Sequence, residues 1–183
     1  MLAVEYLKVV LDEVYPGLAW DGGDSKRTAE RFVSYLLEYA PSDVCPFEAT
    51  VFEHHGDQLV MAGPTFYSSI CQHHLLPYYG QAWVGYVSNG LVIGASKMPR
   101  LVAWAAARPS TQEQMAVFIS KQLNRWLKPK GAMVVLSAVH TCMTCRGVRC
   151  EGTKLTTSLP TGLFLSEGSA KDEFLLFVHD KGE

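Results

Sequence analysis

The stretch that decides the fold lies in the middle of the chain and reads QAWVGYVSNGLVIGA over residues 81–95. Two apolar runs flank Ser88, Asn89 and Gly90, and an Asn-Gly pair between such runs is a strong signal for a β-hairpin. Further β-rich runs precede this stretch at residues 49–54, 58–62 and 65–70. The middle of the chain therefore predicts an antiparallel sheet.

Helical periodicity lies on both sides of this sheet. We expect helices over residues 2–15 and from about Ser25 or Thr28 to Tyr39, and two helical pieces between Ser96 and Lys128 that break near Pro109. The remaining runs favour extended structure, at residues 132–142, 155–164 and 174–178. This order predicts an α+β fold, with a helical region at residues 1–48 and one compact domain at residues 49–183.

Composition and charge exclude several classes of protein. The chain has 183 residues, of which 48% are hydrophobic and 19% charged, as in an ordinary globular protein. The net charge is −2, and no segment of the sequence forms a basic arm or stripe. Nucleic acid is therefore not an expected partner. The N-terminus lacks the features of a secretory signal, and no apolar run approaches the roughly 18 residues that span a bilayer. We therefore expect no membrane partner and a cytoplasmic location.

Cysteine and histidine gather in two short segments, Cys71 to His74 and His140 to Cys142. The chain has 5 cysteines, and an odd count without an export signal favours metal binding or catalysis over disulfides. Thiolate and imidazole are the ligands that zinc prefers, and a catalytic zinc site takes three of them plus a water. The two segments therefore predict one metal site.

Spacing divides these residues by role. Residues two apart on a strand point to the same face, so His140 and Cys142 are expected to project together. Cys71 and His74 can both reach one ion if the chain turns between them. This makes Cys71, His74 and Cys142 the predicted ligands. His73 is left, with His140, as a candidate acid or base, since histidine titrates nearest the working pH.

Two further patterns leave alternatives open. Cys142 and Cys145 form a C-x-x-C pair, which with Cys71 and His74 would complete a closed structural site of four ligands. Three basic residues near the same segments suit phosphate oxygens, although lone basic residues usually form a solvated face. These residues are Lys97, Arg100 and Arg146.

Four blocks in the sequence resemble, in the same order, the motifs of the GTP cyclohydrolase I family. They are FYSSICQHHLLPYYG at residues 66–80, IGASKMPR at 93–100, RPSTQE at 108–113 and AVHTCMTCRGV at 138–148. Residues 28–31 also resemble the start of the family's N-terminal helix, and residues 156–164 its last strand. The order of the blocks over most of the chain argues against a chance match.

This resemblance implies a fold and an assembly. The fold is the tunnelling fold, in which an antiparallel sheet is backed by a helix pair and subunits join their sheets into a barrel. The implied assembly is a homodecamer of two face-to-face pentamers, with active sites at subunit interfaces. The implied reaction converts GTP and water to 7,8-dihydroneopterin triphosphate and formate, with Zn²⁺ as the cofactor.

The resemblance also assigns roles to residues. Zinc held by Cys71, His74 and Cys142 activates the water that attacks C8 of guanine, and His140 protonates N7 as the ring opens. His73 assists the later opening and rearrangement of the ribose. The implied substrate-binding residues are Ser96 at the sugar, Thr111, Gln112 and Glu113 at the guanine edge, and Lys97, Arg100 and Arg146 at the triphosphate.

Several positions depart from the family pattern. Gln72 stands where the family usually has Glu beside the metal, and Ser110 replaces a frequent Gln. Ala82, Trp83, Ala95 and Cys145 depart from it as well. Gln72 and Ser110 suggest, as an alternative, an altered cyclohydrolase that acts on a deoxy or modified guanine nucleotide. A second alternative is a zinc-stabilised binding protein without activity, which would use Cys71, His74, Cys142 and Cys145 together. The sequence does not indicate which pathway the pterin would enter.

Overall fold

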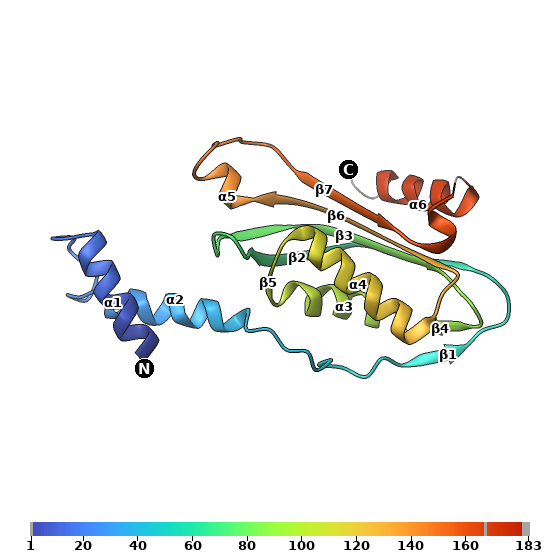
Figure 1. Ribbon diagram of the computed structural model, residues 1–183, viewed down its shortest axis with the longest axis horizontal. Coiled ribbons are helices and arrows are strands. Elements are labelled where there is room, and N and C mark those ends of the chain that lie inside the picture. Colours follow the sequence, from blue (N-terminus) through green and yellow to red (C-terminus); the bar gives the residue numbers. More distant parts are fainter. Residues whose placement is uncertain (1, 167, 181–183) are drawn as a thin grey trace. The chain divides into compact units, whose positions relative to one another are not determined.

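The computed structural model describes residues 2–166 and 168–180 (Figure 1). The chain divides into two compact units, with the boundary between Ala40 and Pro41. Each unit has its own secondary structure.

The first unit is a pair of helices, α1 (Leu2–Val14) and α2 (Lys26–Glu38), as the sequence predicts. Ser25, directly before α2, is fully buried, and its hydroxyl donates to Asp12 Oδ1 at 2.6 Å. Lys8 Nζ donates to the other oxygen of this carboxylate, also at 2.6 Å. The Asp12 side chain therefore ties the two helices together.

The second unit is built on a five-stranded sheet with the order β5-β2-β3-β6-β7. Its strands are β2 (Leu59–Cys71), β3 (Pro77–Val87), β5 (Pro109–Ser110), β6 (Gly131–His140) and β7 (Leu155–Pro160). All neighbours are antiparallel except β5, which runs parallel to the end of β2. The predicted antiparallel sheet is confirmed, with one short parallel pair added at the edge.

The two strands expected at residues 58–62 and 65–70 form one strand, β2. Its register against β3 shifts between Ala62 and Thr65. The intervening residues are Gly63, whose φ is 153°, and Pro64, which has no N–H to donate to a neighbouring strand. The sequence signal for a break at this point therefore marks a bulge inside a continuous strand.

The predicted hairpin around Asn89 and Gly90 is wrong. The strand after this turn, β4 (Leu91–Ile93), pairs with β1 (Val51–Glu53) in a separate two-stranded sheet. The amide of Ile93 donates to the hydroxyl of Tyr86 at 3.0 Å instead of to the backbone of β3. Side-chain and long-range contacts thus decide the pairing after the turn.

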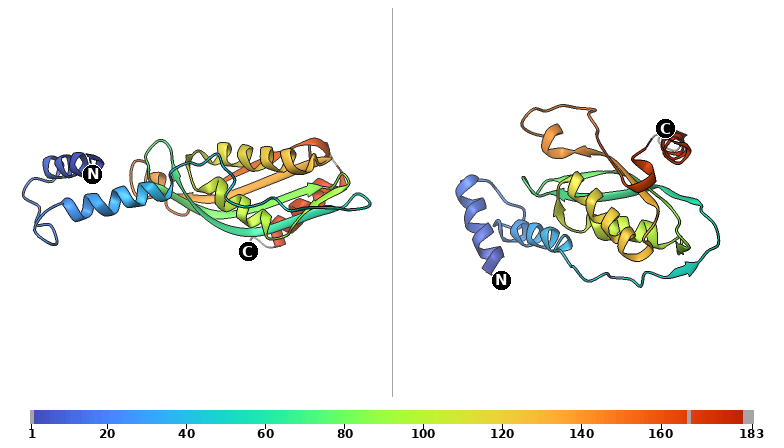
Figure 2. Two further views of the ribbon diagram at one scale, coloured as in Figure 1. Left: turned by 90° about the horizontal axis from the view of Figure 1, so that it is seen from below. Right: turned by 45° about the vertical axis from the view of Figure 1, so that its right-hand side comes forward.

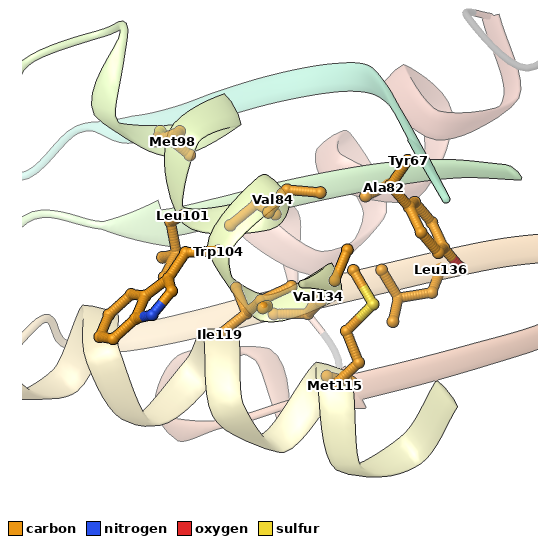
Figure 3. Packing of buried hydrophobic residues seen from close by; sticks show 14 of the residues in the cluster. Tyr67, Ala82, Val84, Met98, Leu101, Trp104, Met115, Ile119, Val134 and Leu136 are labelled. Atoms are coloured by element: carbon orange, nitrogen blue, oxygen red, sulfur yellow. The ribbon is translucent and has the colours of Figure 1, made fainter. Parts of the chain in front are cut away.

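Two helices, α3 (Lys97–Ala106) and α4 (Gln112–Leu127), cover one face of the large sheet (Figure 2). Trp104, Met115 and Ile119 from these helices pack against Val84 and against other alternate residues of the strands (Figure 3). Thr111 caps α4, because its hydroxyl accepts from the amide of Gln114 at 3.2 Å. The predicted α+β fold, with a sheet backed by a helix pair, is confirmed.

The opposite face of the sheet is covered by the C-terminal part of the chain. Trp83, Met133 and Val135 pack there against Phe164 of η1 (Gly162–Phe164) and Phe174 of α6 (Ser169–Asp180). The extended structure expected at residues 174–178 is wrong, because these residues lie in α6. A short apolar run does not distinguish a strand from a helix that is buried on one side.

In the described part of the chain, no helix is both long enough and apolar enough to span a membrane.

Candidate functional site

A tight turn at the end of β2 brings the first two candidate ligands together. The carbonyl of Cys71 accepts from the amides of His74 at 3.3 Å and Leu75 at 2.8 Å, and the amide of Cys71 donates to Leu76 O at 2.9 Å. Leu75 has a φ of 53°, which reverses the chain. As a result, Cys71 Sγ lies 3.9 Å from His74 Nδ1 and 3.7 Å from His73 Nδ1.

The third candidate ligand, Cys142, comes from a helix and not from a strand. β6 ends at His140, and α5 (Thr141–Thr144) begins at the next residue. The hydroxyl of Thr141 donates to Pro77 O at 2.6 Å and so holds α5 beside the start of β3. The expectation that His140 and Cys142 share a strand face is therefore wrong.

The turn and α5 nevertheless bring the three predicted ligands together. The ligand atoms of Cys71, His74 and Cys142 all lie within 4.8 Å of one another. Zinc bonds to sulfur and nitrogen are about 2.0–2.3 Å long, which separates two ligand atoms of a tetrahedral ion by roughly 3.5–4 Å. Small side-chain adjustments would bring these atoms to that spacing.

The electrostatics of the thiols also suit a metal cation. Burial, followed by the neighbouring Cys71, raises the pKa of Cys142, and Arg146 acts in the opposite direction. Two thiolates this close repel each other, and a cation between them removes that repulsion. The donor set and its spacing therefore fit a zinc ion.

Cys145 lies outside this ligand group. Its exposed thiol donates to Thr141 O at 2.8 Å. Among residues 2–166 and 168–180, the group that could hold a metal consists of Cys71, His74 and Cys142. This arrangement supports an open site of three protein ligands over a closed site of four.

One pocket contains the candidate ligands and most of the other predicted site residues. Its volume is about 200 Å³. It lies at one end of the sheet, where β2 and β6 end and α4 begins, at the left in Figure 1. Its lining consists of Cys71, His73, His74, Thr111, Gln112, Glu113, His140, Cys142, Met143 and Leu155.

His140 is buried in this pocket and contacts a ring on one side and an amide on the other. It is only 7% exposed, and its ring stacks on that of Tyr78, with centroids 4.5 Å apart. Its Nε2 lies 3.0 Å from Oε1 of Gln112. Burial lowers the pKa of His140, and the carboxylate of Glu113 partly opposes this effect.

Sequence reasoning missed Tyr78. This residue lies opposite His140 in the pairing of β3 with β6, and its hydroxyl is 3.1 Å from Ser110 Oγ. The pairing register of β3 with β6 places Tyr78 beside His140, and the sequence alone does not determine that register.

Thr111 and Gln112 line the pocket, but their polar groups already form hydrogen bonds within the protein. The amide of Thr111 donates to Gln114 Oε1 at 3.1 Å, and its carbonyl accepts from Met115 at 3.1 Å. The side chain of Gln112 is 1% exposed and hydrogen-bonded within the protein. Glu113, in the first turn of α4, is the acidic residue of the pocket.

Three predicted substrate-binding residues lie away from this pocket. The start of α3 contains Ser96, Lys97 and Arg100. The other end of α3 is the one near the pocket, because it is followed by β5, which pairs with β2 at Cys71. Ten helical residues span about 15 Å. Arg100 lines a separate hollow of about 440 Å³. By contrast, Arg146 is near enough to Cys142 to influence its pKa.

These features define an α+β enzyme with a candidate metal centre at one end of its sheet. The family model for GTP cyclohydrolase I matches residues 22–179. The chain belongs to the GTP cyclohydrolase I family.

Individual relatives agree with this membership. GTP cyclohydrolase 1 of Streptococcus mutans serotype c is 39% identical over 157 residues, which cover 84% of this chain and 80% of that protein. The enzyme of Streptococcus pyogenes serotype M5 is 37% identical over 151 residues, covering 82% and 77%. That of Lysinibacillus sphaericus is 32% identical over 176 residues, covering 95% and 93%.

A search of solved structures matches an archaeosine synthase QueF-Like protein in its apo form, with a TM-score of 0.45 and 17% identity. This match covers 57% of the present chain and 93% of the other.

Proposed function

We propose that the chain is a zinc-dependent GTP cyclohydrolase I, which converts GTP and water to 7,8-dihydroneopterin triphosphate and formate. The observation that carries the proposal is one pocket lined by three possible zinc ligands, two further histidines and one glutamate. Relatives named GTP cyclohydrolase 1 support the same assignment.

In this proposal, Cys71, His74 and Cys142 hold Zn²⁺ and leave a fourth position open. A bound ion would lower the pKa of a water towards ~7 and would so supply the hydroxide that attacks C8 of guanine. Cys145 does not compete for that position, because its thiol is directed to Thr141 O.

Glu113 is the proposed guanine-recognising residue. It lines the pocket from the first turn of α4, where the helix dipole favours a negative charge. A carboxylate can accept from both N1–H and the 2-amino group of guanine. Adenine lacks an N1–H and a 2-amino group, so it leaves the carboxylate without these partners.

The two remaining histidines are the proposed proton carriers. His140 gives a proton to N7 of guanine as the five-membered ring opens. His73, on the exposed turn after β2, assists the later opening and rearrangement of the ribose. Both side chains line the pocket that also contains the candidate ligands.

The triphosphate site requires more than one copy of the chain. Arg146 is close to the pocket, but Ser96, Lys97 and Arg100 are at the far end of α3. A neighbouring copy can supply these three residues if the sheets join edge to edge. In the described sheet, β7 forms one edge, and β5 covers only Ile70 and Cys71 of β2 at the other. We therefore propose interfacial sites in a decamer of two pentamers.

The decisive test is a product assay combined with metal analysis on one preparation. Incubation with GTP is expected to release formate and, after oxidation, a fluorescent pterin. A preparation that contains zinc but forms neither product would contradict the proposal. Mass analysis of products from GTP and dGTP also tests for an altered cyclohydrolase, the alternative suggested by Gln72 and Ser110.

A further inference from the structure

The side chain of Gln112 contacts the protein interior at three oxygen atoms. Its Nε2 lies 3.1 Å from Leu136 O, 3.0 Å from Leu155 O and 3.0 Å from Thr157 Oγ1. Leu136 belongs to β6, and the other two residues belong to β7. The amide thus links the first residue of α4 to two adjacent strands.

These contacts determine which way the amide faces. Carbonyl oxygens accept hydrogen bonds and cannot donate them. The atom that faces Leu136 O and Leu155 O must therefore be the NH₂ group, because the flipped amide would place three oxygens against one another. Oε1 of Gln112 is consequently the atom 3.0 Å from Nε2 of His140.

The orientation of the amide in turn determines the tautomer of His140. Oε1 is only an acceptor, so Nε2 of the imidazole must carry a hydrogen. Stacking on Tyr78 at 4.5 Å holds the plane of the ring. In the neutral ring, Nδ1 then has the lone pair. Among the hydrogen bonds of the described residues, none reaches Nδ1 of His140.

We propose that Gln112 is a positioning residue that keeps His140 in the Nε2–H tautomer, so that Nδ1 is the nitrogen that exchanges a proton with the substrate. This inference rests on the proposed function. The proton donor is the charged ring, in which both nitrogens carry a hydrogen. When this imidazolium protonates N7 of guanine, the Nδ1–H bond breaks and the N7–H bond forms. The ring returns to the neutral state with Nε2–H still bonded to Gln112. In this role Gln112 acts through His140, and its side chain does not contact guanine.

Solid-state NMR on the zinc-loaded protein labelled with ¹⁵N-histidine tests the tautomer directly. The chain has 6 histidines, so comparison with His140→Gln identifies the signals of His140. At a pH at which the ring is neutral, we expect a protonated Nε2 and an unprotonated Nδ1. A neutral ring protonated at Nδ1 would overturn the proposal.

Two variants separate positioning from general support of the fold. Gln112→Met removes the acceptor, and we expect His140 to lose its single tautomer and kcat for GTP to fall about 10²-fold, with a smaller change in KM. Unchanged tautomer and kcat in this variant would contradict the proposal. Thr157→Val removes one partner of the same amide but leaves the acceptor, so tautomer and kcat are expected to stay close to wild type. If Thr157→Val loses the tautomer as Gln112→Met does, packing and not the acceptor holds the ring.

These readouts also distinguish the inference from the proposed function. If the wild-type protein forms no product from GTP, the proposed function fails, while the NMR signals of His140 still report whether Gln112 sets the tautomer. If the product forms but Nδ1 carries the hydrogen of the neutral ring, only the inference fails.

Discussion

The imidazole ring of His140 lies parallel to the phenol ring of Tyr78, with an interplanar angle of 2°. The two residues are directly opposite each other on β6 and β3. The hydroxyl of Tyr78 is in turn 3.1 Å from Ser110 Oγ, at the edge of the sheet. The sheet backbone thus fixes both rings, and His140 is held in one plane before any substrate enters.

Two variants of Tyr78 separate its ring from its hydroxyl. Tyr78→Phe keeps the stacked ring and loses the buried hydrogen bonding of the hydroxyl with Ser110 and Ser69. We therefore expect a loss of about 1–2 kcal/mol in the free energy of unfolding and a nearly unchanged kcat. Tyr78→Leu removes the ring, and kcat is expected to fall by roughly 10-fold or more because His140 can tilt. Chemical denaturation and steady-state assays measure both effects. Equal kcat values for Tyr78→Leu and wild type would show that the stack does not position His140.

Metal content distinguishes the three-ligand site from a four-ligand site. Cys142→Ser is expected to lower bound zinc and to abolish formate release, because one of the three proposed protein ligands is lost. Cys145→Ser is the matched control, since its thiol only donates to Thr141 O. This control is expected to retain zinc and activity. Elemental analysis after dialysis gives the comparison, and loss of zinc from Cys145→Ser would favour the closed structural site.

Substrate analogues test the role of Glu113. Glu113→Gln replaces an acceptor oxygen by a donor, and we expect kcat/KM for GTP to fall roughly 10- to 100-fold, as for a lost hydrogen bond to a charged group. Inosine triphosphate lacks the 2-amino group, so the preference of wild type for GTP over this analogue should narrow in the variant. An unchanged preference would mean that another group reads the guanine edge.

Mixed assemblies test whether two copies build one site. The Arg100→Ala variant is expected to be inactive because it lacks a proposed triphosphate-binding residue. The Cys142→Ser variant is expected to be inactive because it lacks a proposed zinc ligand. Co-expression of the two should restore activity in about a quarter of the sites, where the unaltered halves meet. Cys142→Ser with His74→Ala is the control, since both changes affect the same half and no activity should return. Absence of activity in the first mixture, with mixed oligomers confirmed by mass, would mean that each chain forms its own site.

Acid is expected to weaken the helical unit through Asp12. Hydrogen bonds from Lys8 and then Ser25 lower the pKa of Asp12 below its ordinary value of 3.8. A carboxyl with a lowered pKa stabilises the folded state above its ordinary pKa, and this contribution is lost as the pH falls through the lowered value. Thermal unfolding followed by circular dichroism between pH 6 and pH 2 measures it. Asp12→Asn should show a smaller change over that range, and an identical acid response would exclude this carboxylate as its source.

The candidate ligands could be predicted from the sequence because ligand preference belongs to individual side chains. Cys71 and His74 lie within one turn, so their proximity depends on few residues. The location of Cys142 beside them was predicted for the wrong reason, because a helix and not a strand positions it. Side-chain chemistry was therefore a better guide than the local secondary structure.

Contacts between distant elements could not be predicted in this way. The strand after Gly90 pairs with β1 because β1 approaches from elsewhere in the chain, and the turn sequence has no information about that approach. Likewise, Tyr78 and Gln112 reach His140 only through the register of the sheet and the start of α4. The short apolar run at Phe174 favours a strand, because its helical face becomes evident only against the residues of the sheet that it covers.

Backbone amide hydrogens are expected to exchange slowly in one half of the pocket and rapidly in the other. β6 is paired on both sides and covered on both faces, so its amides are expected to open only with the whole unit. α5 is four residues long and has no buried residue, so its amides should exchange far earlier. His140 and Cys142, only two residues apart, therefore lie on opposite sides of this boundary. The proposed proton carrier therefore lies on the rigid side, and a zinc ion bound as proposed is expected to exchange with solvent first at α5.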